Sequence, residues 1–339
     1  MKQKNPLLTL LLLCCSVALC LVALEIGLRW GKVRVRSVNG QQLHLKRWAR
    51  PDPVLGWTAN PGIWEVDCEQ RPMTILDNAT RKTCFQPGAS KNILIVGGSW
   101  IQGYGVRDEE TCASQLQQRF SSVNFVNLAT AGYGNYQSYL ATKSFLEKSG
   151  AESVSMVILA VAEHSSVRDV ADYAWIRSLL TYSGTHFIPP RIAPGPKNLS
   201  DAPWLEYPPE SPNLWRLADK LDIVLCLQEM LMCFKTRNRY ATYGDKAATQ
   251  VIGWLWPYLK ERGVELVVID LFGAERVDKE LGAYCRTNGL PYLRARGDIP
   301  DNDPEWYLHR GKCKGHPNEK YQGLWAATLG DYLAGQGLR

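Results

Sequence analysis

The most constraining feature of the sequence is a short apolar run, Asn92–Val96, that ends at Gly97-Gly98-Ser99. Such a run, rich in β-branched residues and bounded by glycine, predicts a buried strand. Because glycine has no Cβ, the glycine pair permits a tight turn at the strand end. Residues 108–120 then have helical spacing, so Ser99 lies between a strand and a helix. Open parallel sheets form ligand sites at this edge; the alternative is a solvated serine that only ends the strand.

Downstream of this run, apolar segments alternate with helical patterns. This alternation predicts an α/β fold with a parallel sheet and right-handed crossovers. The expected strands are 123–128, 154–161, 264–271 and 292–294, and the expected helices are 135–148, 247–262, 274–288 and 318–333.

The alternation of strand and helix patterns divides the chain into an α/β domain over 91–339 and a preceding connector over 31–90. The connector is rich in turn signals, has short edge-strand patterns such as Trp64-Glu65-Val66, and is expected to pack on the main domain. An insertion at about 170–245 carries several Pro, Trp and Tyr residues and should form a cap or a cleft wall. Within it, Leu214–Phe234 has a helical pattern, and its aromatic residues suit either a core or a sugar-stacking surface.

The N-terminus carries an apolar segment, and Pro6–Leu24 contains no charged residue. About 20 apolar residues are enough to span a bilayer as a helix. We expect residues 1–30 to be an uncleaved membrane anchor, with a cleavable signal peptide as the alternative. Basic residues on both flanks, including Lys2 and Arg29, leave the orientation open.

Charge and cysteine usage argue against two function classes. The formal net charge is +6 without a long Lys/Arg run, which does not favour nucleic-acid binding. The 10 cysteines form no C-x-x-C pair, so no structural metal site is expected. If the domain lies outside the cytoplasm, the candidate disulfides are Cys68–Cys84 and Cys285–Cys313; free buried thiols are the alternative.

Three further positions can join Ser99 at the same sheet edge. Gly132 follows the second strand of the α/β domain, His164 follows the third, and His316 comes just before the last helix. In a parallel sheet these segments can converge on one edge, where a backbone N–H of Gly132 could face the cleft. Each position also has a plainer interpretation, such as a surface histidine at position 164 or a helix-start residue at position 316.

The four segments together resemble the conserved blocks of the SGNH, or GDSL-type, hydrolases. The chain is most similar to the bacterial members that begin with one apolar helix. The matching blocks are Gly97-Gly98-Ser99 with Gly103-Tyr104-Gly105-Val106, then Asn127 with Gly132-Tyr133-Gly134, and finally His316-Pro317-Asn318. The resemblance covers residues 92–169 and 305–335.

The resemblance implies a three-layer α/β/α fold and acyl transfer through a covalent acyl-serine. Ser99 would be the nucleophile and His316 its general base. The backbone N–H groups of Ser99 and Gly132 would stabilise the oxyanion, with His164 or Ser165 in the place of the family's asparagine. The resemblance implies no metal or organic cofactor. The substrate implied is a small acyl group, an acetyl above all, on a carbohydrate or another cell-envelope molecule, with the domain in the periplasm or outside the cell.

Three family positions differ in this chain. Gly98 stands where the family has aspartate, His164 or Ser165 stands where it has asparagine, and Cys313 stands where an aspartate precedes the histidine. A missing third group does not abolish catalysis in principle, because that group orients the base. Two alternatives therefore remain beside the ester hydrolase or acyltransferase. One is a catalytically degenerate domain that binds envelope glycan or an assembly partner, and the other is a lipid or thioester hydrolase.

Overall fold

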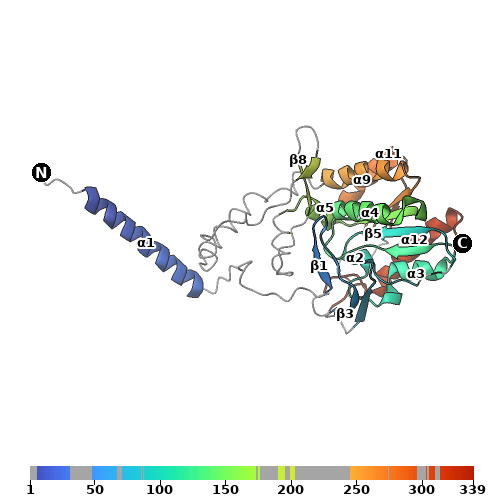
Figure 1. Ribbon diagram of the computed structural model, residues 1–339, viewed down its shortest axis with the longest axis horizontal. Coiled ribbons are helices and arrows are strands. Elements are labelled where there is room, and N and C mark those ends of the chain that lie inside the picture. The colour runs from blue at the N-terminus through green and yellow to red at the C-terminus, as the bar shows by residue number, and fades with distance from the viewer. Residues whose placement is uncertain are drawn as a thin grey trace.

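The computed structural model describes residues 6–30, 48–66, 71–84, 86, 88–172, 175, 190–194, 199–202, 245–273, 275–295, 303, 305–309 and 314–339. Its centre is a parallel five-stranded sheet in the order β11-β10-β7-β5-β6 (Figure 1). The strands are β5 (Asn92–Val96), β6 (Asn124–Asn127), β7 (Val154–Val161), β10 (Glu265–Asp270) and β11 (Tyr292–Arg294). The chain leaves β5 toward β6 on one side and then returns to β7 on the other, which makes the end of β5 the topological switch point of the sheet.

Helices cover both faces of the sheet, because successive side chains of a strand point to opposite faces. In β5, Ile93 and Ile95 join the core beneath α3 (Cys112–Arg119) and α12 (Glu319–Gly335). Leu94 and Val96 join the core beneath α4 (Asn135–Ser149) and α9 (Asp245–Lys260). The expected three-layer α/β/α fold is thus confirmed.

Two expected helices are interrupted. The pattern over 108–120 divides into the 3-10 turn η1 (Asp108–Glu110) and α3, because the Thr111 side chain caps α3 by accepting a hydrogen bond from Ser114 N. The pattern over 274–288 becomes α10 (Glu275–Val277), the π-helical turn η4 (Asp278–Gly282) and α11 (Ala283–Thr287). Three short elements complete the domain, namely α2 (Ser99–Gln102), η2 (Ala151–Ser153) and α5 (Glu163–Asp169).

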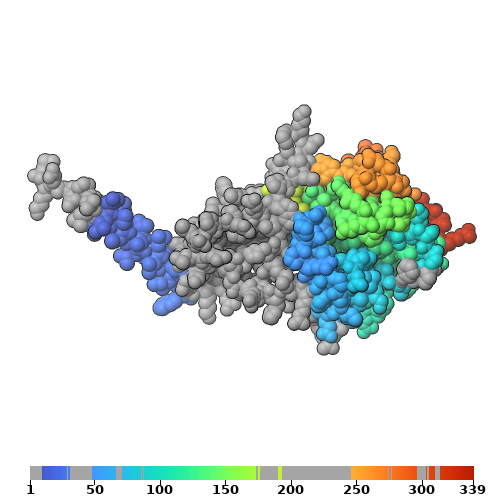
Figure 2. Space-filling model, in the orientation of Figure 1, coloured from blue at the N-terminus to red at the C-terminus, as the bar shows by residue number. Residues whose placement is uncertain are grey.

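Small hairpins pack on the carboxyl edge of the sheet. The antiparallel pairs are β1 (Ala49–Asp52) with β2 (Gly56–Ala59), β3 (Gly62–Val66) with β4 (Arg71–Ile75), and β8 (Arg191–Pro194) with β9 (Leu199–Ala202). Buried residues of β2 and β4, such as Trp57 and Met73, share core clusters with Tyr104 and Tyr133 of the main domain. The surface of the β1–β4 hairpins is continuous with that of the α/β body (Figure 2).

The N-terminal helix α1 (Pro6–Trp30) lies apart from the α/β body (Figure 1). Its segment Leu10–Leu28 has a mean hydropathy of 2.5 and none of it is buried. By length and composition this helix can cross a membrane, although a signal sequence would have the same properties.

The candidate disulfides are not formed. Cys84 and Cys285 carry free thiols, the first exposed and the second buried. Burial in the core beneath α9 gives the Cys285 thiol an apolar environment that needs no disulfide. Their candidate partners Cys68 and Cys313, the expected helix Leu214–Phe234 and most of the insertion at 170–245 lie outside the described residues.

Candidate functional site

Ser99 is the first residue of α2, directly after the turn that ends β5. Gly97 has φ +155°, and a Cβ there would lie 2.7 Å from the Ile101 side chain and 2.9 Å from Ala160 O. Only glycine therefore lets the chain turn so tightly against β7. The turn leaves Ser99 buried, with 5% of its surface exposed, at the switch point of the sheet.

His316 is held by a short antiparallel ladder between the segment 306–308 and the residues before α12. Leu308 N donates to His316 O at 2.8 Å, and Gly315 N donates to Leu308 O at 3.0 Å. Asn318 N donates to Trp306 O at 2.9 Å, and the Asn318 side chain caps α12. The ladder fixes the backbone on both sides of His316 immediately before the helix.

Ser99 and His316 come together across 217 positions of sequence. The distance between Ser99 Oγ and His316 Nε2 is 3.2 Å, which is a hydrogen bond. One side chain ties the two elements that carry them, because Gln322 of α12 donates to Trp100 O at 2.8 Å and accepts from Cys112 N at 3.0 Å. The predicted hydroxyl and imidazole are thus paired in the folded chain.

Gly132 lies in the loop after β6, which is tied to the turn before Ser99 because Thr130 N donates to Gly97 O at 3.1 Å. Its φ is +88°, and a Cβ there would lie 2.9 Å from the Trp57 ring. Trp57 of β2 also holds this loop by donating from Nε1 to Ala131 O at 3.0 Å and by accepting from Tyr133 Oη at 2.6 Å. Within the described part of the chain, the Gly132 N–H donates no hydrogen bond. It is a free donor of the kind that an oxyanion hole uses.

His164 lies in α5, after β7, and its ring packs edge-on against Trp100 with the ring centroids 4.2 Å apart. Burial lowers the pKa of His164 well below its usual value, and the charges of Arg168 and His316 lower it further. The imidazole of His164 is consequently neutral at pH 7, with one N–H donor and one acceptor nitrogen. Trp100, on which the His164 ring packs, directly follows Ser99 in α2.

Arg168 of α5 fills the space beside Gly98. A Cβ at position 98 would lie 2.9 Å from Arg168 Nη1 and 3.1 Å from Tyr133 O. The guanidinium donates from Nη1 to Tyr133 O at 2.8 Å and lies 4.7 Å from the centre of the Trp175 ring. Burial lowers the pKa of Arg168 to about 10, and the neighbouring charge of Asp169 partly opposes this shift. The arginine remains positively charged at pH 7.

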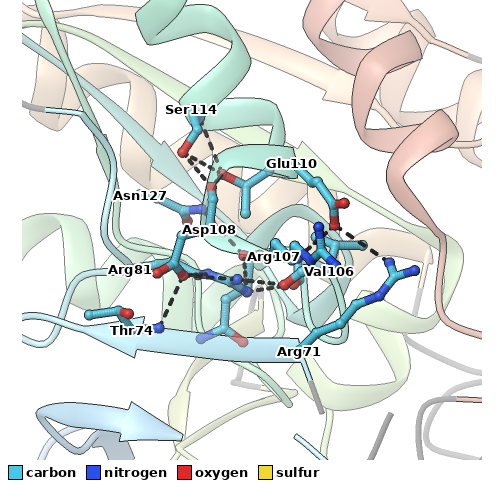
Figure 3. A network of polar contacts seen from close by, with 12 residues as sticks. Arg71, Thr74, Arg81, Val106, Arg107, Asp108, Glu110, Ser114 and Asn127 are labelled. Atoms are coloured by element: carbon cyan, nitrogen blue, oxygen red, sulfur yellow. Dashed lines mark hydrogen bonds and ion pairs between the residues drawn. The ribbon is translucent and has the colours of Figure 1, made fainter. Parts of the chain in front are cut away.

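A second buried arginine, Arg81, holds the loop that follows Ser99 (Figure 3). Its guanidinium donates to the carbonyl oxygens of Gln102, Gly103 and Val106. It also forms an ion pair with Asp108, with 3.1 Å between Nη2 and Oδ1. The Arg81 side chain is completely buried, and its backbone N–H donates to Asn127 O at the edge of β6. Arg81 thereby fixes the backbone carbonyl groups of the loop that follows Ser99.

No carboxylate is seen in the family's aspartate position. Cys313, which stands there, lies outside the described residues. The nearest upstream carboxylates in the sequence are Asp301, which also lies outside them, and Asp303. Asp303 is described, and its side chain accepts from Glu305 N at 2.9 Å. The described residues also contain no group of three or more His, Cys, Asp or Glu side chains that could hold a metal ion.

Sequence reasoning missed Arg81, Arg168 and the supporting tryptophan Trp57. Arginine is rarely buried, so a sequence gives no general reason to place one in a core. For Arg168 a signal existed, because glycine stands where the similar family has aspartate. The loss of that side chain leaves room for another beside Ser99.

No protein-family profile matches the sequence, and no curated protein matches it. Several solved structures are similar to this one in the course of their backbone. One is a member of the lipolytic G-D-S-L family from Veillonella parvula, with 12% identity, a TM-score of 0.41, and 72% of this chain and 98% of that chain covered. Another is the psychrotrophic esterase EstA from Pseudoalteromonas, with 11% identity, a TM-score of 0.41, and coverage of 73% and 98%.

A third similar structure is a GDSL-like lipase from Bacteroides thetaiotaomicron, with 11% identity, a TM-score of 0.37, and coverage of 75% and 93%. At these identities the likeness concerns the fold alone, because one fold can carry many unrelated activities.

Proposed function

We propose that this chain is a serine-dependent ester hydrolase or acyltransferase. The observation that supports the proposal is the 3.2 Å separation of Ser99 Oγ and His316 Nε2 at the switch point of the sheet. Serine is a weak nucleophile until a base takes its proton, and a histidine within hydrogen-bond distance is such a base.

In the proposed reaction, Ser99 Oγ attacks the ester carbonyl carbon while His316 Nε2 accepts the hydroxyl proton. This requires the His316 tautomer with its proton on Nδ1. The carbonyl oxygen becomes an oxyanion, and the alcohol then leaves as His316 returns the proton. Water or an acceptor hydroxyl attacks the acyl-serine in a second step, with His316 again as the base.

The proposed oxyanion donors are the N–H groups of Ser99 and Gly132, with a third donor from the neutral His164 ring. The first N–H groups of a helix have no partner within it, which leaves that of Ser99 available. Each such donor is worth roughly 3 kcal/mol of transition-state stabilisation in enzymes of this type. Trp57 and Arg81 support these donors indirectly, because they fix the loops on both sides of Ser99.

The acyl group we propose is small, an O-acetyl group above all, and its carrier a carbohydrate or another cell-envelope molecule. The sequence resemblance and the aromatic residues of the insertion support this choice. We further propose that α1 anchors the chain in a membrane as a single-pass helix, with the α/β domain in the periplasm or outside the cell. Proteolysis of intact cells would remove the domain in that orientation and spare it in the reverse one.

The test compares the full chain, purified in detergent, with its Ser99→Ala and His316→Gln variants on 4-nitrophenyl acetate. We expect Ser99→Ala to reduce the rate to background and His316→Gln to reduce kcat by about 10²- to 10⁴-fold, the usual worth of a general base. Ser138→Ala is the matched control, because the hydroxyl of that buried serine of α4 donates to Gly134 O, the residue before the helix.

Labelling with a fluorophosphonate extends the test beyond one substrate. Ser99 should be the modified residue, and His316→Gln should slow its modification. Rates that are equal in the wild type and Ser99→Ala, together with no labelling of Ser99, would reject the proposal. That outcome, with a positive glycan-binding screen, would instead support a catalytically degenerate binding protein.

A further inference from the structure

The surroundings of Ser99 are rich in unused hydrogen-bond donors. The N–H of Gly132 has no partner among the described residues. The indole N–H of Trp175 is buried and also lacks a partner. A buried donor without a partner is costly, so the Trp175 N–H, next to a second unused donor, indicates that a ligand supplies acceptors. The two residues are neighbours, since a Cβ at Gly132 would lie 3.4 Å from the Trp175 ring.

Arg168 adds a positive charge to this group of donors. Its guanidinium has five N–H groups, yet among the described residues it makes one hydrogen bond, from Nη1 to Tyr133 O. It lies against the Trp175 ring, and Gly98 leaves room for it beside Ser99. The remaining donors of the planar fork suit a carboxylate or a phosphate.

The nearest carboxylate does not neutralise Arg168. Asp169 accepts hydrogen bonds from Asn135 Nδ2 and Tyr136 N, both at 2.8 Å. Within the part of the chain that the structure describes, no carboxylate comes within ion-pair distance of Arg168. The positive charge beside the nucleophile is therefore available to a ligand.

We propose that Arg168, together with the Trp175 and Gly132 N–H donors, forms an anion subsite, so that the preferred ester carries a carboxylate or phosphate near its carbonyl group. This inference rests on the proposed ester hydrolysis and names the substrate class of that same site. The anion can belong to the acyl part of the ester or to its alcohol part. Gly98 is then a specificity residue, because its missing side chain gives Arg168 its place.

The experiment uses two matched substrate pairs on the full chain in detergent. For the acyl part, 4-nitrophenyl butyrate is compared with mono-4-nitrophenyl succinate. For the alcohol part, 4-nitrophenyl acetate is compared with the acetate ester of 5-hydroxy-2-nitrobenzoate. Rates measured with Ser99→Ala are subtracted, since anionic esters of this kind also hydrolyse without a catalyst. The ratio of kcat/KM within each pair does not depend on the fraction of folded enzyme.

We expect the anionic ester of at least one pair to be preferred by about 10- to 100-fold, the range of a hydrogen bond to a charged group. The pair that shows the preference identifies which part of the ester carries the anion. Arg168→Met should bring that ratio to about one, and Arg168→Lys should keep part of it. Arg119→Met is the control, because Arg119 pairs with Asp331 far from the site and should leave the ratio unchanged. Equal ratios in the wild type and Arg168→Met would overturn the subsite.

A binding measurement separates this proposal from that of ester hydrolysis. Inorganic phosphate and succinate are titrated into Ser99→Ala and Ser99→Ala/Arg168→Met, with thermal unfolding as the readout. A rise in Tm that requires Arg168 supports the anion subsite even if no ester is hydrolysed. If Tm does not rise and the wild type shows no preference for anionic esters, the subsite is rejected, whatever the hydrolase activity.

Discussion

The two arginines beside Ser99, the fully buried Arg81 and the partly buried Arg168, differ in how their hydrogen bonds are used. Arg81 donates to three carbonyl groups and pairs with Asp108, whereas Arg168 donates to one carbonyl group and pairs with no carboxylate among the described residues. A saturated buried cation stabilises the fold around it, because removing it leaves its partners unpaired. An unsaturated cation beside the nucleophile has donors left for a ligand. Arg81 therefore stabilises the fold, whereas Arg168 is available for substrate recognition.

The largest expected effect is on Arg81. Arg81→Met should lower the free energy of unfolding by about 3–5 kcal/mol, because the partly buried Asp108 and three buried carbonyl groups lose their partner. Urea unfolding of the full chain in detergent measures this change. Arg71→Met is the control, since Arg71 is partly exposed and pairs with Glu110 and Glu319 at 3.5 Å and 3.1 Å. It should cost about 1 kcal/mol or less. Equal losses in the two variants would contradict the assigned role of Arg81.

Asp169, the residue next to Arg168, is expected to make the stability of the fold depend on pH. Burial raises the pKa of Asp169 to about 7, while hydrogen bonds from Tyr136 and Asn135 and the charge of Arg168 oppose the shift. In the unfolded chain the pKa is about 3.9, so the folded state binds more protons between about pH 4 and pH 7. The contribution of Asp169 to stability is thus present below about pH 4 and is lost as the pH rises toward 7, by at most about 1.4 kcal/mol per pH unit.

The measurement is the unfolding free energy of the wild type and of Asp169→Asn across this pH range. The difference, wild type minus variant, should fall as the pH rises, because asparagine does not titrate. It can still accept the hydrogen bond from Tyr136 N. A difference that stays constant or rises would show that Asp169 is ionised throughout.

A smaller loss of stability is expected for Arg168→Met. It removes one hydrogen bond, to Tyr133 O, which is worth about 1 kcal/mol. Urea unfolding beside Arg81→Met checks the ratio of the two losses. A loss as large as that of Arg81→Met would mean that Arg168 is also an architectural residue.

The last expected effect is on substrate preference, in Gly98→Asp. Gly98 has φ −91°, which any residue can adopt, but a Cβ there would lie 2.9 Å from Arg168 Nη1 and 3.1 Å from Tyr133 O, so the guanidinium must shift. The new carboxylate would meet the Arg168 guanidinium and occupy the donors that we assign to substrate. The preference for anionic esters should therefore vanish. A preference that survives in Gly98→Asp would place the anion elsewhere.

The sequence predicts the sheet well, because its signals are local. The runs at 92–96 and 154–161 become β5 and β7, since a buried parallel strand needs a continuous apolar segment. The closeness of Ser99 and His316 is inferred from their place at strand and helix ends. The hydrogen bond itself depends on distant contacts such as that of Gln322 with Trp100 O, which no local pattern predicts.

The residues that hold the site were harder to predict. Arg81 lies in a stretch of turn signals without periodicity, and its three carbonyl partners are backbone groups that the sequence cannot display. The interruption of the helix at 108–120 came from Thr111, whose side chain can cap a helix or continue one. The Arg81 contacts are thus set by tertiary packing, whereas the Thr111 cap is a local contact that the helical spacing of 108–120 does not show.

The position of the β1–β4 hairpins governs where the chain can be shortened. Trp57 and Arg81 hold the two loops beside Ser99 from segments that precede the first central strand. A soluble fragment starting at residue 91 would keep every group proposed to react, yet it would release both loops and uncover the β6 margin that Arg81 now occupies. A fragment for crystallisation or enzymology should accordingly start ahead of Trp48.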